Sequence, residues 1–152
     1  MNRRHVLSGA AAAAAGLAAL PAARADHHEK QSGDHGHELT GKKKADVQQM
    51  TEHVVLLNRV AEHCLEQIKE KQGDVTDHAQ NHEHVMDCVP VCQTTAAFMV
   101  RESPLSQSMH RASAECCEKT AKALEASSDK SAVVAECVKS SRECAEMCRT
   151  YI

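Results

Sequence analysis

The cysteines constrain this chain more than any other feature. Eight of them occur in 152 residues that include no tryptophan, one tyrosine and one phenylalanine. Several recur four or seven residues apart, as in Cys88 and Cys92, and in Cys137, Cys144 and Cys148. On a helix these intervals return to one face. The spacing therefore predicts helices whose inner faces carry thiols where large apolar side chains would normally lie.

Residues 1–25 have the pattern of an export signal. Arg3 and Arg4 precede a mildly apolar stretch rich in Ala and Gly, and Ala-Arg-Ala at positions 23–25 matches an A-x-A cleavage site. The paired arginines favour a twin-arginine signal, with a general secretory signal as the alternative. The apolar stretch is shorter than the roughly 20 residues of a membrane span. We therefore expect an exported, periplasmic protein with no membrane partner.

Residues 26–44 form a polar segment without apolar periodicity, which predicts a flexible tail. Its histidines (His27, His28, His35 and His37) either capture Cu(II) or Zn(II) or belong to an ordinary polar tail. The formal net charge of the whole chain is −3, and the arginines of the signal account for part of its basic side chains. Such a surface gives no reason to expect a nucleic-acid partner, which requires basic stripes.

Residues 45–152 have the composition of a helical domain, with Gly73 as their only glycine and Pro90 and Pro104 as their only prolines. Periodicity and stop signals predict helices over about 45–72, 76–102, 103–126 and from about 130 to the C-terminus. Short connections make neighbouring helices antiparallel. The predicted fold is thus all-α, an up-down-up-down four-helix bundle.

Within the second helix, one face is expected to carry His84, Cys88, Cys92, Thr95 and Met99. Pro90 conflicts locally with this helix, because a proline inside a helix removes a hydrogen bond and clashes with a preceding carbonyl. We expect either a kink between the two cysteines or a restart of the helix at Pro90. Both arrangements keep Cys88 and Cys92 close together.

Exported cysteines usually form disulfides, and a disulfide-stabilised bundle with a structural or partner-binding role is one interpretation. Thiols four apart on a helix leave in parallel directions, however, and do not bridge each other easily. Adjacent Cys116 and Cys117 would pair only in a strained vicinal bridge. A free-thiol count on the untreated protein separates this interpretation from metal binding.

A metal-binding interpretation depends on which motifs are missing. The chain has no C-x-x-C, which argues against zinc ribbons, iron–sulfur clusters, thioredoxin-like redox sites and c-type haem. It has no Glu-x-x-His pair of a di-iron centre and no other constellation typical of an enzyme, so we expect no catalytic activity. Thiols in an i, i+4 pair can share one soft ion, and Cu(I) accepts sites with few thiolates. Several Cu(I) ions are therefore the best match.

On these residues the chain resembles the bacterial copper storage proteins, four-helix bundles lined with cysteines, and in particular their exported, twin-arginine branch. The resemblance covers about 45–152 and rests on three stretches: Cys88-Val-Pro-Val-Cys92, the Cys116-Cys117 pair, and residues 137–148. It implies storage of multiple Cu(I) ions, with a low-stoichiometry copper chaperone or sensor as the alternative. It also implies a homo-oligomer, and storage requires a copper-donor or copper-acceptor protein. The expected Cu(I) ligands are the thiolates of Cys64, Cys88, Cys92, Cys116, Cys117, Cys137, Cys144 and Cys148.

Folding the predicted helices back on one another places Cys92 near Cys116 and Cys117 near Cys137. It also places Cys148 at the end of the bundle that holds a second group of candidate ligands. These thioether and imidazole side chains are either copper-uptake ligands or ordinary core residues: Met50, Met99, Met109 and His110. At the opposite end, His78 and His82 with Cys64 and His84 form either another metal site or an exposed helix start.

Overall fold

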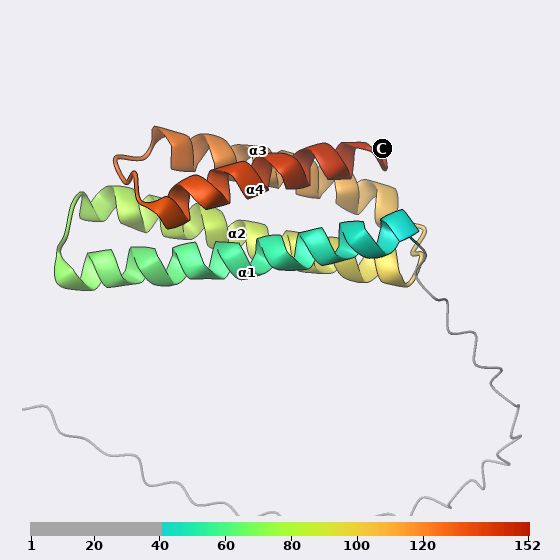
Figure 1. Cartoon of the computed structure of the whole chain (residues 1–152), viewed down its shortest axis with the longest axis horizontal. Coiled ribbons are helices and arrows are strands. Elements are labelled where there is room, and N and C mark those ends of the chain that lie inside the picture. Colours follow the sequence, from blue (N-terminus) through green and yellow to red (C-terminus); the bar gives the residue numbers. More distant parts are fainter. Residues whose placement is uncertain (1–40) are drawn as a thin grey trace, which may run out of the picture. The chain divides into compact units, whose positions relative to one another are not determined.

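The structure, a computed structural model, describes residues 41–152, and these form helices without any strand. The helices are α1 (Gly41–Glu70), α2 (Val75–Val100), α3 (Ser106–Ala126) and α4 (Ala132–Arg149). Each helix packs against its two neighbours in the cyclic order α1, α2, α3, α4 (Figure 1). The short connections make the bundle antiparallel, which confirms the predicted all-α, up-down-up-down fold. The predictions for the export signal and the tail histidines lie outside the described residues.

Local signals explain most helix boundaries. Gly73 adopts φ 63°, a left-handed conformation that favours glycine. The Asp74 side chain then accepts hydrogen bonds from the backbone N–H groups of Thr76 and Asp77 and caps α2. The predicted start of the third helix was early. Pro104 lies in the turn that precedes α3, which begins at Ser106.

The helix α2 runs without interruption through Pro90, so the predicted restart does not occur. Pro90 is exposed, and its ring therefore faces away from the bundle interior. The Sγ atoms of Cys88 and Cys92 lie 3.7 Å apart. The two thiols thus stay close, as both sequence-based alternatives required.

The bundle core combines aliphatic side chains with thiols. Met50, Leu57, Met99 and Leu124 are among its largest fully buried side chains, and burying such a side chain contributes about 1.5–3 kcal/mol. Seven cysteines are buried as well, and Cys116 is half-buried. The predicted inward position of Thr95 is confirmed, since its side chain is buried. The prediction of an inward His84 was wrong: His84 is exposed, and its neighbour Val85 is buried instead.

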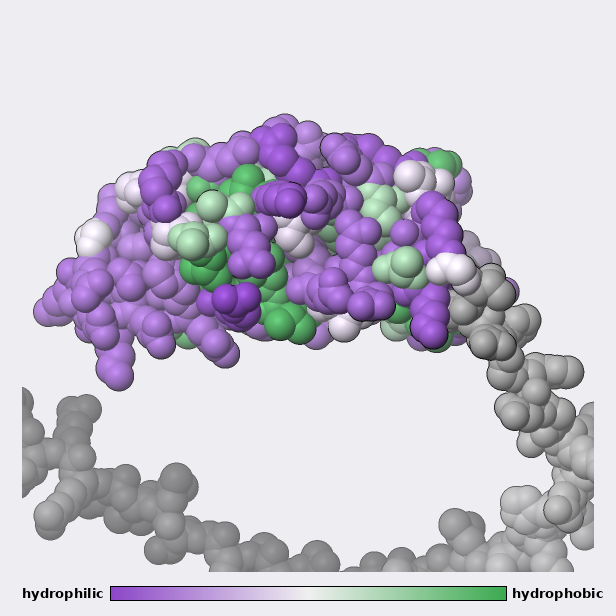
Figure 2. All heavy atoms as spheres, in the orientation of Figure 1, coloured by the Kyte–Doolittle hydropathy of each residue, from purple (hydrophilic) through white to green (hydrophobic). Residues whose placement is uncertain are grey.

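Polar residues dominate the face of the bundle drawn in Figure 2, and hydrophobic residues appear there only in patches. No helix within residues 41–152 combines the length and the apolar character that crossing a membrane requires.

Candidate metal centre

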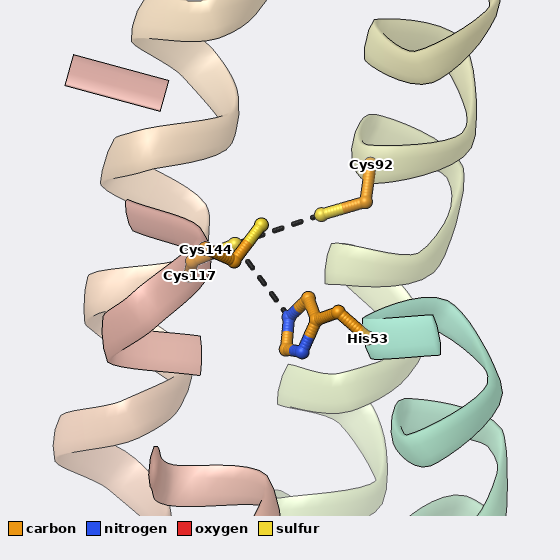
Figure 3. A group of neighbouring side chains, drawn as sticks. All are labelled: His53, Cys92, Cys117 and Cys144. Carbon is orange, nitrogen blue, oxygen red and sulfur yellow. Dashed lines mark hydrogen bonds between the residues drawn. The ribbon is translucent and has the colours of Figure 1, made fainter. Parts of the chain in front are cut away.

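Each of the four helices contributes one side chain to a buried group near the middle of the bundle. His53 comes from α1, Cys92 from α2, Cys117 from α3 and Cys144 from α4. One ligand atom from each lies within 4.8 Å of all the others, and the four side chains converge as Figure 3 shows. Because the helices hold the group from four sides, its geometry is set by the packing of the bundle.

The distances between sulfur atoms suit a shared ion. Cys117 Sγ lies 3.6 Å from Cys92 Sγ and 3.7 Å from Cys88 Sγ. A disulfide requires about 2.05 Å, and all eight cysteines are free. With metal–sulfur bonds of about 2.3 Å, three thiolates around one ion lie about 4.0 Å apart and two opposite ones about 4.6 Å apart. Small movements of the side chains would therefore admit a metal.

The thiol contacts continue to both sides of this group. Cys116 hydrogen-bonds to Cys88, and Cys148 hydrogen-bonds to Cys144. Six cysteines from three helices, all buried except the half-buried Cys116, are thus linked in one chain of contacts, called the thiol cluster below. Its members are Cys88, Cys92, Cys116, Cys117, Cys144 and Cys148.

Protons are shared unequally within the thiol cluster. Hydrogen bonds from Cys117, then from Cys144 and Cys88, hold the pKa of Cys92 below its usual value despite burial. Hydrogen bonding to Cys144 and Cys92, together with burial, raises the pKa of Cys117. Hydrogen bonds from Cys88 and Cys144 lower the pKa values of Cys116 and Cys148 in the same way. Three sulfurs of the cluster are therefore prepared as thiolates, while the thiols between them keep their protons until a cation replaces them.

His53 adds a nitrogen ligand that the sequence analysis did not assign. Its Nδ1 lies 2.9 Å from Ser140 Oγ, and its Nε2 lies 3.6 Å from Cys117 Sγ. Burial lowers the pKa of His53 below 6.5, so the imidazole is neutral at pH 7. With the Nδ1 proton donated to Ser140, the Nε2 lone pair faces the thiols. His53 has the helical spacing of the buried residues Met50 and Leu57, which is typical of an ordinary core position.

The predicted neighbours within the bundle were partly wrong. Cys92 lies near Cys116, as predicted, but its direct contact is with Cys117, and Cys117 lies beside Cys144 rather than Cys137. Successive helical residues point about 100° apart, so only Cys117 shares the inner face of α3, and Cys116 turns toward α2. Cys137 stands seven residues before Cys144, about 10 Å away along α4.

Cys64 and Cys137 are buried outside the thiol cluster, nearer the end of the bundle with the α1–α2 and α3–α4 loops. Burial, and then the carboxylates of Asp129 and Asp77, raise the pKa of Cys64 from 9.0 to about 11. Burial likewise raises the pKa of Cys137 from 9.0 to about 11, although a hydrogen bond with Ser141 opposes it. These two thiols are fully protonated at neutral pH.

At the opposite end, His110 is the predicted uptake residue with a free ligand atom. Its Nδ1 donates to the Ser106 carbonyl oxygen at 2.7 Å. Its buried Nε2 has no hydrogen-bond partner within residues 41–152, and its ring stacks on Tyr151 with centroids 4.5 Å apart. Met50 and Met99 are buried in the core, whereas Met109 is only half-buried.

The sequence of this chain was compared with models of known protein families. The model of the family described as "Csp: Copper storage protein" matches residues 42–152. The chain belongs to the copper storage protein family. This match covers all four helices and every cysteine, so the cysteine-lined bundle is the family domain itself. Comparisons with curated proteins and with solved structures gave no match. Family membership and the buried Cys/His group both fit copper binding.

Proposed function

We propose that this copper storage family member binds and stores multiple Cu(I) ions through the thiolates inside its bundle, and that it catalyses no reaction. One observation carries the proposal: the six cysteines of the thiol cluster are linked to one another, five of them buried, with His53 Nε2 3.6 Å from Cys117 Sγ. A redox enzyme would need one exposed, reactive thiol, whereas these thiols are gathered and mostly buried.

The thiol cluster favours a soft ion of low coordination number. Thiolates are soft ligands, and Cu(I) is bound by few of them. Cys92 is among the first thiolates offered, because its neighbours donate hydrogen bonds to it. As copper enters, the neighbouring thiols release their protons and turn from hydrogen-bond donors into ligands. Each added ion replaces S–H···S contacts by shared metal–sulfur bonds.

Copper enters, in this proposal, at the end that holds His110, Met50, Met99 and Met109. The free Nε2 of His110 is a neutral ligand there, because burial lowers the pKa of His110. Imidazole and thioether bind Cu(I) less tightly than thiolate does, so they would pass an ion inward to the thiol cluster. Cys64 and Cys137 would fill last, since both their protons must be displaced.

We also propose export to the periplasm by the twin-arginine route. The support is the pair Arg3 and Arg4 ahead of an apolar stretch and an A-x-A pattern. Export of an already folded bundle would protect reduced thiols on the way to an oxidising compartment. Replacing both arginines by lysine should leave the protein in the cytoplasm, and unchanged export of that variant would oppose this part of the proposal.

Anaerobic titration of the reduced protein with Cu(I) against a competing chelator tests the storage role. Paired thiolate bridging allows roughly one ion per thiol, so uptake of about eight ions is expected. Uptake of one or two ions would support a chaperone or sensor instead. Few free thiols in freshly isolated apo protein would favour the disulfide-stabilised bundle.

A further inference from the structure

A second group of metal-ligating side chains lies at the end of the bundle formed by the α1–α2 and α3–α4 loops. It consists of His63 on α1, His78 on α2 and Asp129 in the α3–α4 loop, and is called the His–Asp group below. Asp129 Oδ2 lies 2.8 Å from His63 Nε2 and 3.7 Å from His78 Nδ1. The side chains of His78 and Asp129 are 5% and 8% exposed, and that of His63 is 22% exposed.

The nitrogen of His78 that faces this group has no partner. His78 Nδ1 is buried and makes no hydrogen bond within residues 41–152, because 3.7 Å to the carboxylate is beyond hydrogen-bonding distance. Buried polar atoms are almost always satisfied, and an exception calls for an explanation such as an ion. A cation between His78 Nδ1 and Asp129 Oδ2 would satisfy both atoms.

The distances fit a cation with short bonds. Zinc binds histidine nitrogen and carboxylate oxygen at about 2.0–2.2 Å, so two tetrahedral ligands lie about 3.3–3.5 Å apart. The two separations from Asp129 Oδ2, 2.8 Å and 3.7 Å, lie to either side of this value. The two imidazole rings are farther apart, with centroids separated by 6.2 Å and nitrogens outside the 4.8 Å range of the His53 group, so a bound ion would draw the rings together. Two imidazoles and a carboxylate suit a borderline divalent ion, whereas Cu(I) prefers thiolates.

The surrounding loops hold Asp129 in place. The backbone N–H of Ser131 donates to Asp129 Oδ1 at 2.8 Å, which leaves Oδ2 directed at the histidines. Asp77 Oδ2 fixes the same loop to α2 by accepting hydrogen bonds from Ser127 and Ser128. Burial has the largest influence on the pKa of Asp129 and raises it, but hydrogen bonds from the backbone and side chain of Ser131, then from His63, together hold the pKa below its usual value. The carboxylate is therefore ionised and already oriented.

Gly73 lets the α1–α2 loop approach closely. A Cβ atom at this position would lie 3.1 Å from His78 Nε2, tighter than an ordinary van der Waals contact. The residue's positive φ also favours glycine. The closing loop thus holds the His78 ring against the group from the side opposite Asp129.

We propose that the His–Asp group binds one borderline divalent cation of the zinc class, separately from the copper held by thiolates. Such an ion joins α1, α2 and the α3–α4 loop through His63, His78 and Asp129, with the remaining positions open to water. It closes the loop end of the bundle, away from the uptake end at His110. Copper storage does not require it, so the two proposals can fail independently.

Cobalt(II) is the probe for the test, because its d–d absorption reports nitrogen and oxygen ligands and its charge-transfer bands report thiolates. The full chain is first saturated with Cu(I) without oxygen, so that thiols are occupied, and is then titrated with Co(II) and back-titrated with Zn(II). We expect d–d bands from one ion that Zn(II) displaces. His78→Gln and Asp129→Asn should each weaken this binding at least tenfold.

His84→Gln is the matched control, since it removes an exposed histidine of the same helix and should leave the binding unchanged. The histidines of residues 26–44 are the same in every variant, so they cannot cause a difference. Circular dichroism and Cu(I) uptake confirm that each variant is folded. If Asp129→Asn does not fold, the Co(II) binding of His78→Gln alone decides the test. Unchanged Co(II) binding in the folded variants, thiolate charge-transfer bands, or no binding by the parent would overturn the proposal and leave a purely structural hydrogen-bonded group.

Discussion

The raised pKa values of Cys64 and Cys137 make the last stage of copper loading steeply dependent on pH. Both values are about 11, so at pH 7 only about one thiol in 10⁴ carries the charge that a metal ligand needs. Each protonated thiol that becomes a ligand releases one proton, and the apparent affinity rises about tenfold per pH unit for each such thiol. An ion held by both thiols should therefore bind about 10⁴-fold more weakly at pH 6 than at pH 8.

This prediction can be measured by anaerobic competition with a Cu(I) chelator calibrated at each pH. The weakest-bound ions of the parent protein should show the steep dependence. The double variant with Cys64→Ser and Cys137→Ser should lose those ions and retain the flatter dependence of the thiol cluster, where the lowered pKa values of Cys92, Cys116 and Cys148 mean that fewer protons are released. Equal affinities at both pH values, or a steep dependence that survives in the double variant, would refute the reasoning.

Three further outcomes are expected. Cys117→Ser should lower the copper retained after gel filtration more than Cys137→Ser does, because Cys117 Sγ lies within 3.7 Å of two other thiols; equal losses would contradict the cluster. Leu57→Ala removes a fully buried side chain and should destabilise the apo protein by about 2–5 kcal/mol in urea unfolding. The exposed control Val55→Ala should cost less than about 0.5 kcal/mol, and similar values for both would contradict the packing. Cu(I) at about 1,000 times Kd should stabilise the bundle by about 4 kcal/mol per site and raise its Tm, and an unchanged Tm would argue against binding to the folded state.

The fold could be predicted from the sequence because its signals are local. Apolar and thiol positions recur with helical spacing, and Gly73 and the 127–131 segment interrupt them where the chain turns. Pro90 does not interrupt α2, because it faces outward and the helix continues on both sides of it. Helix starts depend on individual cap contacts, which explains the early boundary predicted at Pro104.

The sequence could not predict which side chains contact one another within the site. Whether Cys116 or Cys117 faces the centre depends on the rotation of α3 against its neighbours, a property of packing rather than of spacing. His53 becomes a candidate ligand only because Cys92, Cys117 and Cys144 reach the same level from the other three helices. Asp129 likewise stands in a loop, and its contact with His63 joins residues 66 positions apart in the chain.

Anomalous scattering at the copper edge, from crystals of the protein loaded with Cu(I) without oxygen, tests the central claim most directly. Storage by the thiol cluster predicts several copper peaks inside the bundle, each about 2.3 Å from two or more sulfur atoms, with the densest group around Cys92, Cys117 and Cys144. Copper confined to surface histidines, or a bundle interior without copper whose cysteines have formed disulfides, would contradict it.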